Sequence, residues 1–110
     1  MRLRTAVPAV MGALLLTLAM PSSANAAAIG IFTYRAEGHA LPLELVDPPN
    51  EECIDVPGAT DVDPARNPRN GTLSRATVFL DFGCQGDTFY VMNPGKVLGN
   101  RLTFRSVIFG

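Results

Sequence analysis

The sequence predicts an all-β fold, a small β-sandwich or barrel, from three observations. Short runs of β-branched and aromatic residues alternate with turns rich in glycine, proline and asparagine, and no run has a helical period. Cys53 and Cys84 can form a single covalent link. Residues 1–26 have the pattern of a cleaved leader, which leaves 84 of the 110 residues for one domain.

The leader has the three parts of a secretory signal peptide in order. Arg2 and Arg4 supply positive charge, residues 7–20 form an apolar run, and residues 24–26 have the small-x-small pattern of a cleavage site. The apolar run is shorter than the roughly 20 residues that a membrane span needs. We therefore expect the leader to be removed on export, the protein to be secreted, and the membrane to play no part afterwards.

Removal of the leader changes the charge of the remaining domain, residues 27–110. Seven basic and ten acidic residues remain, which gives a net charge of −3. The charge is uneven, because residues 27–63 have a net charge of −7 and residues 64–110 a net charge of +4. This asymmetry indicates either a partner-binding face or two halves that neutralise each other within one fold. An acidic domain does not favour nucleic acid as a partner.

The two cysteines are expected to form a disulfide in an oxidising compartment. The ring that joins Cys53 to Cys84 would contribute about 3.5–4 kcal/mol in the loop-entropy model. A zinc site would need four ligands, and His39 is the one further Cys or His side chain. A paired cysteine also cannot act as a nucleophile.

The first half of the domain contains three predicted strands. The one at 41–46 places Leu41, Leu43 and Leu45 on one face, and Pro42 favours an edge position. Residues 59–71 are predicted to form turns, with Asn70-Gly71 suited to a hairpin. The three strands are expected at residues 29–34, 41–46 and 53–56.

The second half has the strongest alternation. In residues 73–82 every second residue belongs to a mostly apolar group that would share one face of a strand. Residues 102–109 divide in the same manner into two alternating groups, one for each face. Turns at 83–87 and 93–95 separate the predicted strands. The apolar set of the first strand is Ser74, Ala76, Val78, Leu80 and Phe82. The three strands are expected at residues 73–82, 88–92 and 102–109.

The stretch Phe79-Leu80-Asp81-Phe82-Gly83-Cys84-Gln85-Gly86, followed by Ser106 in Phe104-Arg105-Ser106-Val107-Ile108-Phe109, resembles the Greek-key motif of the βγ-crystallin superfamily, as found in small exported bacterial proteins. The resemblance implies a Greek-key β-sandwich. It also implies structural roles for Phe79, Gly86 and Ser106: the glycine permits a folded-over hairpin through positive φ, and the serine hydroxyl bonds back onto that hairpin. The match covers residues 75–109. Residues 32–38 are one residue short of the spacing, and no matching serine follows them.

Many members of this superfamily bind calcium through acidic or amide residues just before a Ser/Thr-Ser pair. At the equivalent stretch this chain has Arg101 and Leu102, with Arg105 before the serine, so the oxygen ligands that calcium needs are missing there. Asp61 and Asp63 could be suggested as calcium ligands instead. We therefore expect no metal or other cofactor, and calcium binding stays as an alternative.

No pattern indicates catalysis, so we expect that the protein is not an enzyme. His39 is the one histidine, no Gly-x-Ser-x-Gly elbow accompanies a serine, and Glu51 and Glu52 lie in a polar loop. Asn70-Gly71-Thr72 has the pattern of an N-glycosylation sequon.

The sequence favours a small secreted, monomeric, non-enzymatic domain that acts by extracellular binding or by structural stability. The alternatives are a secreted protease inhibitor or toxin-like protein, classes in which the resembled fold also occurs, and a calcium-binding protein. The expected partner is an extracellular protein. An inhibitor would present a rigid exposed loop, for which residues 47–52 and 57–70 are the candidates.

Overall fold

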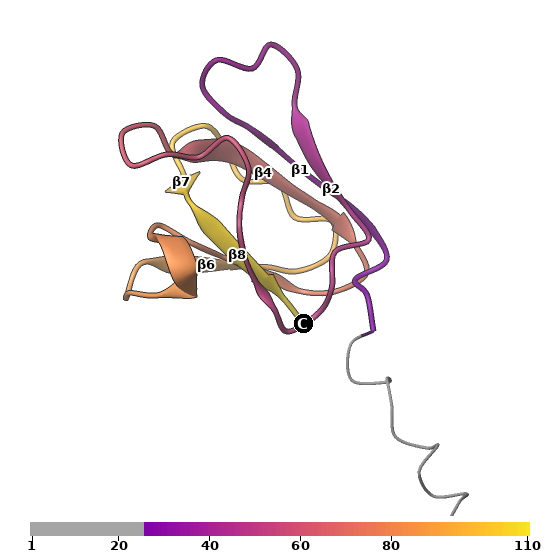
Figure 1. Cartoon of the computed structure of the whole chain (residues 1–110). Helices are drawn as coiled ribbons and strands as arrows, with labels where there is room; N and C mark the ends of the chain where they lie inside the picture. The colour runs from indigo at the N-terminus through magenta and orange to yellow at the C-terminus, as the bar shows by residue number, and fades with distance from the viewer. Residues whose placement is uncertain (1–25) are drawn as a thin grey trace, which may run out of the picture.

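Across residues 26–110, the part of the chain that the computed structural model describes, eight strands form two four-stranded antiparallel sheets (Figure 1). The predicted leader falls outside the described residues, except for Ala26. No α-helix occurs between residues 26 and 110. The strands are β1 (Gly30–Arg35), β2 (Leu43–Val46), β3 (Cys53–Asp55), β4 (Ala65–Thr72), β5 (Ala76–Phe79), β6 (Phe89–Met92), β7 (Thr103–Phe104) and β8 (Ser106–Phe109). A short 3₁₀ turn, η3 (Phe82–Cys84), lies between β5 and β6.

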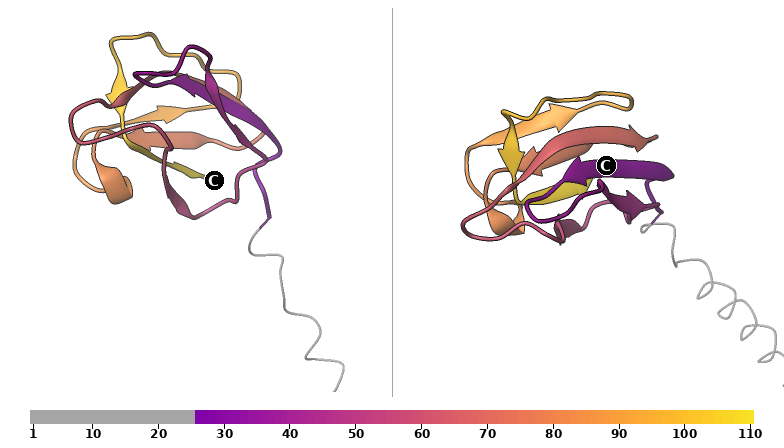
Figure 2. Two further views of the ribbon diagram at one scale, coloured as in Figure 1. Left: turned by 45° about the horizontal axis from the view of Figure 1, so that its top comes forward. Right: turned by 90° about the horizontal axis from the view of Figure 1, so that it is seen from above.

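The two sheets exchange strands. The first sheet has the order β2-β1-β4-β7 and the second has the order β3-β8-β5-β6. Each therefore contains three strands from one half of the domain and one from the other half. Figure 2 shows the sheets as two layers of a β-sandwich. Because β3 and β7 cross between the layers, neither half can form its sheet without the other.

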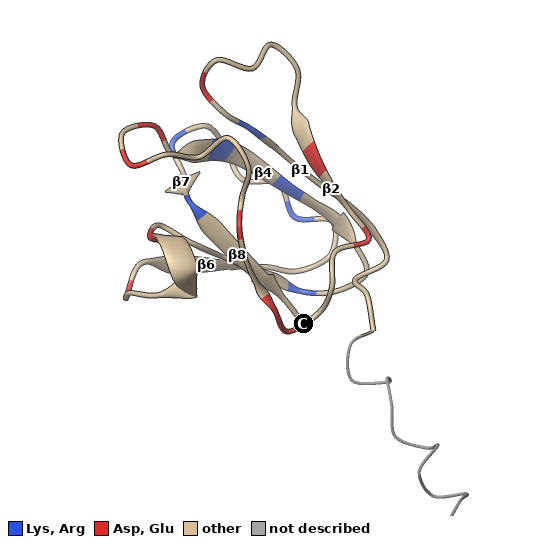
Figure 3. Cartoon of the chain, viewed as in Figure 1, with Lys and Arg blue, Asp and Glu red and all other residues tan. Residues whose placement is uncertain are grey.

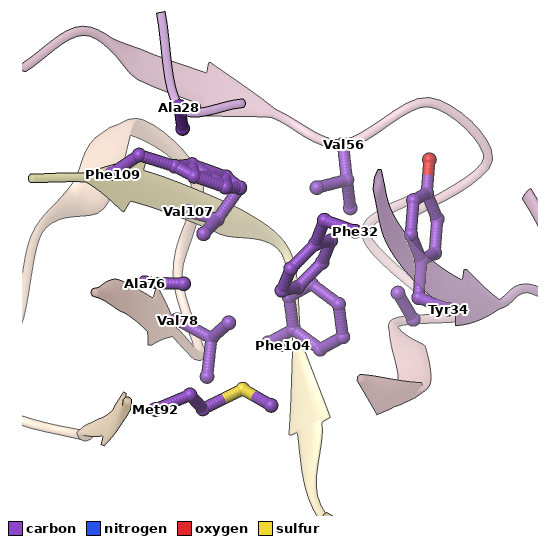
Figure 4. Packing of buried hydrophobic residues seen from close by; sticks show 11 residues of the cluster. Ala28, Phe32, Tyr34, Val56, Ala76, Val78, Met92, Phe104, Val107 and Phe109 are labelled. Atoms are coloured by element: carbon purple, nitrogen blue, oxygen red, sulfur yellow. The ribbon is translucent and has the colours of Figure 1, made fainter. Parts of the chain in front are cut away.

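Aromatic side chains fill the space between the layers. Phe32 on β1 lies at the centre, in edge-to-face contact with Phe109 (ring centroids 5.4 Å apart) and Phe104 (6.1 Å) (Figure 4). Full burial of a side chain of this size stabilises the fold by about 1.5–3 kcal/mol. The other core members are Ala28, Tyr34, Val56, Ala65, Ala76, Val78, Met92 and Val107.

Several strand predictions are confirmed. β1, β2, β3 and β6 lie within one or two residues of their expected ranges. β5 also forms with the predicted face inward, and Ala76 and Val78 are fully buried. It is shorter than predicted, because the chain leaves the sheet after Phe79 and turns through η3. In the first hairpin Leu43 and Leu45 pack against the core, whereas Leu41 is exposed.

The prediction of turns over residues 59–71 is wrong for its second part. β4 is the longest strand, and it contains Asn70-Gly71 in its interior instead of at a hairpin. The inward positions of β4 are mostly small or polar, so no apolar alternation marks the strand in the sequence. They are Ala65, Pro68, Asn70 and Thr72.

The single strand predicted at 102–109 is also wrong. β7 pairs with β4 in the first sheet, while β8 pairs with β5 and β3 in the second. Phe104 and Ser106 are both buried, as alternation predicts, but Val107 is buried as well. The set of alternate residues that points into the core therefore changes between β7 and β8. A segment that has the sequence pattern of one alternating strand is divided between the two sheets.

The buried side chain of Asn70 ties the two sheets together. Its amide nitrogen donates to the carbonyl oxygens of Ser74 (2.8 Å) and Met92 (2.9 Å), and Met92 belongs to the second sheet. Its Oδ1 accepts from the hydroxyl (2.7 Å) and the backbone N–H (3.1 Å) of Thr72. All of its hydrogen-bonding capacity is used. The amide that a glycosylation sequon would offer is thus fully buried.

Replacement of Asn70 should be strongly destabilising. Asn70→Ala leaves buried carbonyl groups without a donor, and Asn70→Asp points a carboxylate oxygen at two carbonyl oxygens. We expect each change to lower the free energy of unfolding by about 2–4 kcal/mol in urea denaturation. Asn100→Ala, at an exposed position, is the control and should shift it by less than about 0.5 kcal/mol. Equal losses at both positions would contradict this role for Asn70.

Candidate functional site

Cys53 and Cys84 form the predicted disulfide, with a Cα–Cα distance of 5.9 Å. Cys53 lies on β3 and Cys84 ends η3, so the bond joins the two halves of the domain. Beside it, the N–H of Gly83 donates to Oδ1 of Asp55 on β3 (2.7 Å). The disulfide therefore fixes the hairpin between β5 and β6, residues 80–88, to an edge of the second sheet.

The structure brings the three residues of the sequence motif to this same hairpin. The Ser106 hydroxyl on β8 donates to the Asp81 carbonyl oxygen (2.6 Å) and accepts from the Cys84 N–H (2.8 Å). Gly86 has φ +91°, and a Cβ there would lie 2.5 Å from an oxygen of Asp81. Phe79, at the start of the hairpin, packs on Phe89 with ring centroids 5.6 Å apart. These contacts hold the hairpin folded.

A different segment, the connection between β3 and β4, combines exposure with firm support. We call residues 57–64 the braced loop. The Arg105 guanidinium lies against it: Nε donates to the Thr60 carbonyl (2.9 Å) and Nη2 to the Asp61 carbonyl (2.9 Å). Its Nη1 donates (3.1 Å) to the carbonyl of Leu80, the residue that begins the hairpin after β5. One planar group thus fixes two successive carbonyls of the loop to the sandwich.

Further contacts hold the ends of the braced loop. The Tyr34 hydroxyl donates to the Pro57 carbonyl (2.7 Å). Thr60 and Asp63 bond to each other twice, through Thr60 N–H to the Asp63 carbonyl (2.8 Å) and Asp63 N–H to the Thr60 hydroxyl (2.9 Å). The loop therefore has a defined shape at both ends and at its turn.

The side chains at the tip of the braced loop point into solvent. Val62 is 82 % exposed, and it lies between Asp61 and Asp63. In Figure 3 the acidic tip projects beside β7. The braced loop therefore holds an aliphatic side chain out in solvent on a backbone that is fixed by hydrogen bonds.

The other candidate segment, residues 47–52, lies along the sandwich. The N–H of Asn50 donates to the Ala26 carbonyl (3.1 Å), and the N–H of Glu51 donates to the Phe109 carbonyl (2.6 Å). Pro48 is buried. Since neighbouring strands already use these backbone groups, this segment is less suited to contact with a partner.

The residues considered for catalysis or metal binding do not come together. In the described part of the chain, the one hydrogen bond of the His39 ring joins Nδ1 to the Glu37 carbonyl oxygen (3.1 Å). Glu51 and Glu52 are exposed. Among residues 26–110 there is no group of three or more His, Cys, Asp or Glu side chains that could hold a metal ion. Over the same range, no helix is long and apolar enough to cross a membrane.

Sequence reasoning did not assign a site role to Arg105 or Tyr34. Arg105 was placed by alternation within a single strand, and Tyr34 within an apolar strand. The bonds of Arg105 to the braced loop join residues 44 and 45 positions apart in the chain, and the bond of Tyr34 joins residues 23 positions apart. The one local feature that could have pointed to a structural role for Arg105 is its position between two buried residues, Phe104 and Ser106.

Comparison with protein-family models, with curated proteins and with solved structures gave no match. A function for this chain is therefore inferred from its own residues and their geometry.

Tyr34 should make stability fall at alkaline pH. Burial raises the pKa of the Tyr34 phenol from 10.0 to about 12. Below pH 10 the folded and unfolded chains both keep this proton; as the pH rises toward 12 the unfolded chain loses it first, so the free energy of unfolding falls. We expect the stability advantage of the native chain over Tyr34→Phe, measured in urea, to shrink over this window. An advantage that stays constant from pH 9 to 12 would contradict it.

Ser106→Ala should release the β5–β6 hairpin. The variant leaves the Cys84 N–H without its acceptor, and we expect a loss of about 1–3 kcal/mol in the free energy of unfolding. Because the disulfide holds the same hairpin, the losses in Ser106→Ala and in the Cys53→Ser, Cys84→Ser double variant should not add. Ser74→Ala, whose hydroxyl makes no hydrogen bond within residues 26–110, serves as the control. Simple additivity would show that the two ties act independently.

Proposed function

We propose that this chain is an exported, non-enzymatic binding domain with a βγ-crystallin-like Greek-key fold, and that the braced loop is its contact surface. The strand order supports the Greek-key part. β4 returns to pair with β1, and β8 returns to pair with β5, as the last strand of a Greek key returns beside its first. The two hydrogen bonds of Ser106 are those that the resemblance implies for this serine.

Export is supported by the leader pattern and by the disulfide. A disulfide persists in an oxidising compartment outside the cytosol. A domain of about 84 residues buries a modest fraction of its surface, so a covalent tie between Cys53 and Cys84 contributes much of its stability.

The observation that carries the binding proposal is the bond set of Arg105. Association loses free energy when a loop must become ordered in the complex. Here the guanidinium fixes the carbonyls of Thr60 and Asp61 before any partner arrives. The loop can thus present Val62 with little further loss of conformational entropy.

Inhibition of a secreted protease is the specific form of binding that the loop favours. Proteases take one side chain of a bound segment into a specificity pocket. Val62 offers an exposed aliphatic side chain for such a pocket. A backbone held by hydrogen bonds also resists the distortion that cleavage would require.

Variants at the tip and at its support should separate contact from fold. Val62→Glu should weaken binding at least tenfold, because it places a third negative charge at the tip and removes the apolar group. Arg105→Gln should weaken it about tenfold and speed hydrogen exchange at residues 57–64. Leu73→Glu is the matched control: Leu73 is 77 % exposed and follows the opposite end of β4. The oxidised protein and its variants would be used as bait in culture supernatant and titrated against secreted serine proteases and metalloproteases.

The outcomes distinguish the two levels of the proposal. A partner that Leu73→Glu releases and Val62→Glu retains would place the contact surface elsewhere. Failure of a stoichiometric excess to inhibit any of these proteases would remove the inhibitor form, while a Val62-dependent partner would still support the binding domain.

A further inference from the structure

The outer face of the first sheet contains a hollow that the braced loop does not use. Its volume is about 450 Å³, in the range of small-molecule sites. Thr33, Asn67 and two arginines, Arg35 and Arg69, provide its polar lining. No carboxylate lines it. Figure 3 shows this basic character as blue segments on β1 and β4.

A bulge in β4 places the arginines on one face. In a regular strand, residues three positions apart point to opposite faces. Here Arg66 and Asn67 are both turned outward between buried Ala65 and Pro68, so Arg69 also points outward. Asn67 has φ +54°, and the β1–β4 register shifts between Thr33 and Arg35. Bulges of this kind redirect side chains and are frequent beside functional sites.

Two carboxylates lie near the arginines of this face, Glu44 opposite Thr33 and Glu37 in an adjoining hollow, but neither forms a salt bridge with them. Arg35 lies directly opposite Arg66 in the β1–β4 register, an arrangement of like charges that is unfavourable. Within residues 26–110, no carboxylate forms a salt bridge with Arg35, Arg66 or Arg69, and their guanidinium groups make no hydrogen bond. A bound anion would relieve this repulsion and use donors that are otherwise free.

Apolar residues flank the arginines on two sides: Pro42 lies beyond β1, before β2, and Val97 and Leu98 lie along the edge of β4 that faces away from β1. Val97 is 53 % exposed, although the chain around it is fixed: Arg69 forms a bridge with Val97, and the Leu98 N–H donates to the Pro68 carbonyl (3.0 Å). Apolar side chains beside the arginines match an amphiphilic anion better than a free inorganic ion.

We propose that this hollow binds a small organic anion, with its carboxylate or phosphate group between Arg35 and Arg69 and its apolar body against Val97 and Leu98. Thr33 and Asn67 supply further polar groups beside the anion. Arg66 lines an adjoining hollow of about 230 Å³ with Arg35, Glu37 and His39, and its charge adds to that of Arg35 across the shared wall. The site goes beyond the proposed function and does not depend on the braced loop.

The test is an NMR titration of the oxidised, isotope-labelled protein at an ionic strength of about 0.15 M. Phenyl phosphate and benzoate distinguish the two head groups, inorganic phosphate lacks the apolar body, and benzyl alcohol lacks the charge. We expect saturable shifts at the amides of Thr33 and Asn67 and at Nε of Arg35 and Arg69 with at least one aromatic anion. Inorganic phosphate should bind more weakly, and benzyl alcohol should not bind.

Substitutions should show a graded response. Arg35→Gln and Arg69→Gln should each raise the dissociation constant about tenfold, and Arg66→Gln about two- to threefold. Arg75→Gln, at an exposed position before β5, is the matched control and should have no effect. The proposal is overturned by shifts that never saturate, by equal effects of Arg75→Gln and Arg35→Gln, or by inorganic phosphate binding as tightly as phenyl phosphate.

Discussion

The passage of the chain from one sheet to the other at Arg105 is the constraint on which the rest of the fold depends. Phe104 ends β7 in the first sheet and Ser106 begins β8 in the second, with one residue between them. Both flanking side chains are buried. The backbone of Arg105 bonds to Phe79 (2.8 Å) and Val56 (3.0 Å), and its guanidinium makes three more bonds. The residue thereby closes the sandwich and supports the loop above it.

Around this crossing, a small number of specific bonds between distant segments, which we call ties, supplies stability that a domain of this size cannot obtain from a large core. The disulfide and Ser106 hold one hairpin, and Asn70 holds β4 to the second sheet. Each tie joins segments distant in the chain. The disulfide and the Ser106 bonds depend on each other, because Cys53 lies on β3, Ser106 lies on β8, and these two strands are paired. Loss of one tie should therefore loosen contacts on both sides of the sandwich.

Local pattern predicted the elements whose buried residues are apolar. The correct face of β5 is predicted because Ala76 and Val78 alternate with Arg75 and Thr77. The disulfide is predicted because the chain has an even number of cysteines and an export leader. β4 could not be predicted, because Asn70 and Thr72 are buried through hydrogen bonds that exist only in the folded chain. The division at Arg105 was hidden for a similar reason: alternation describes one strand and cannot report a change of sheet. The braced loop was named only as part of a longer candidate segment, and the arginine hollow was not foreseen, since it depends on cross-strand register.

Both candidate surfaces lie where the regular pattern is interrupted. The braced loop is supported by the break at Arg105, and the hollow is formed at the bulge of Asn67. Asn67 is one of four non-glycine residues with positive φ in the described chain, a conformation that is unfavourable for most residues and that asparagine tolerates better because its side chain can hydrogen-bond locally. For two of the others the structure shows a local compensation: Asp47 accepts the Gly30 N–H (2.8 Å), and Cys84 is held by the disulfide. Asn67 has no comparable side-chain bond within residues 26–110. Its positive φ turns Arg66 and Arg69 to the same side, which makes the hollow the place where a break in the strand and unpaired positive charge coincide, and an anion bound there would offset the repulsion between the arginines.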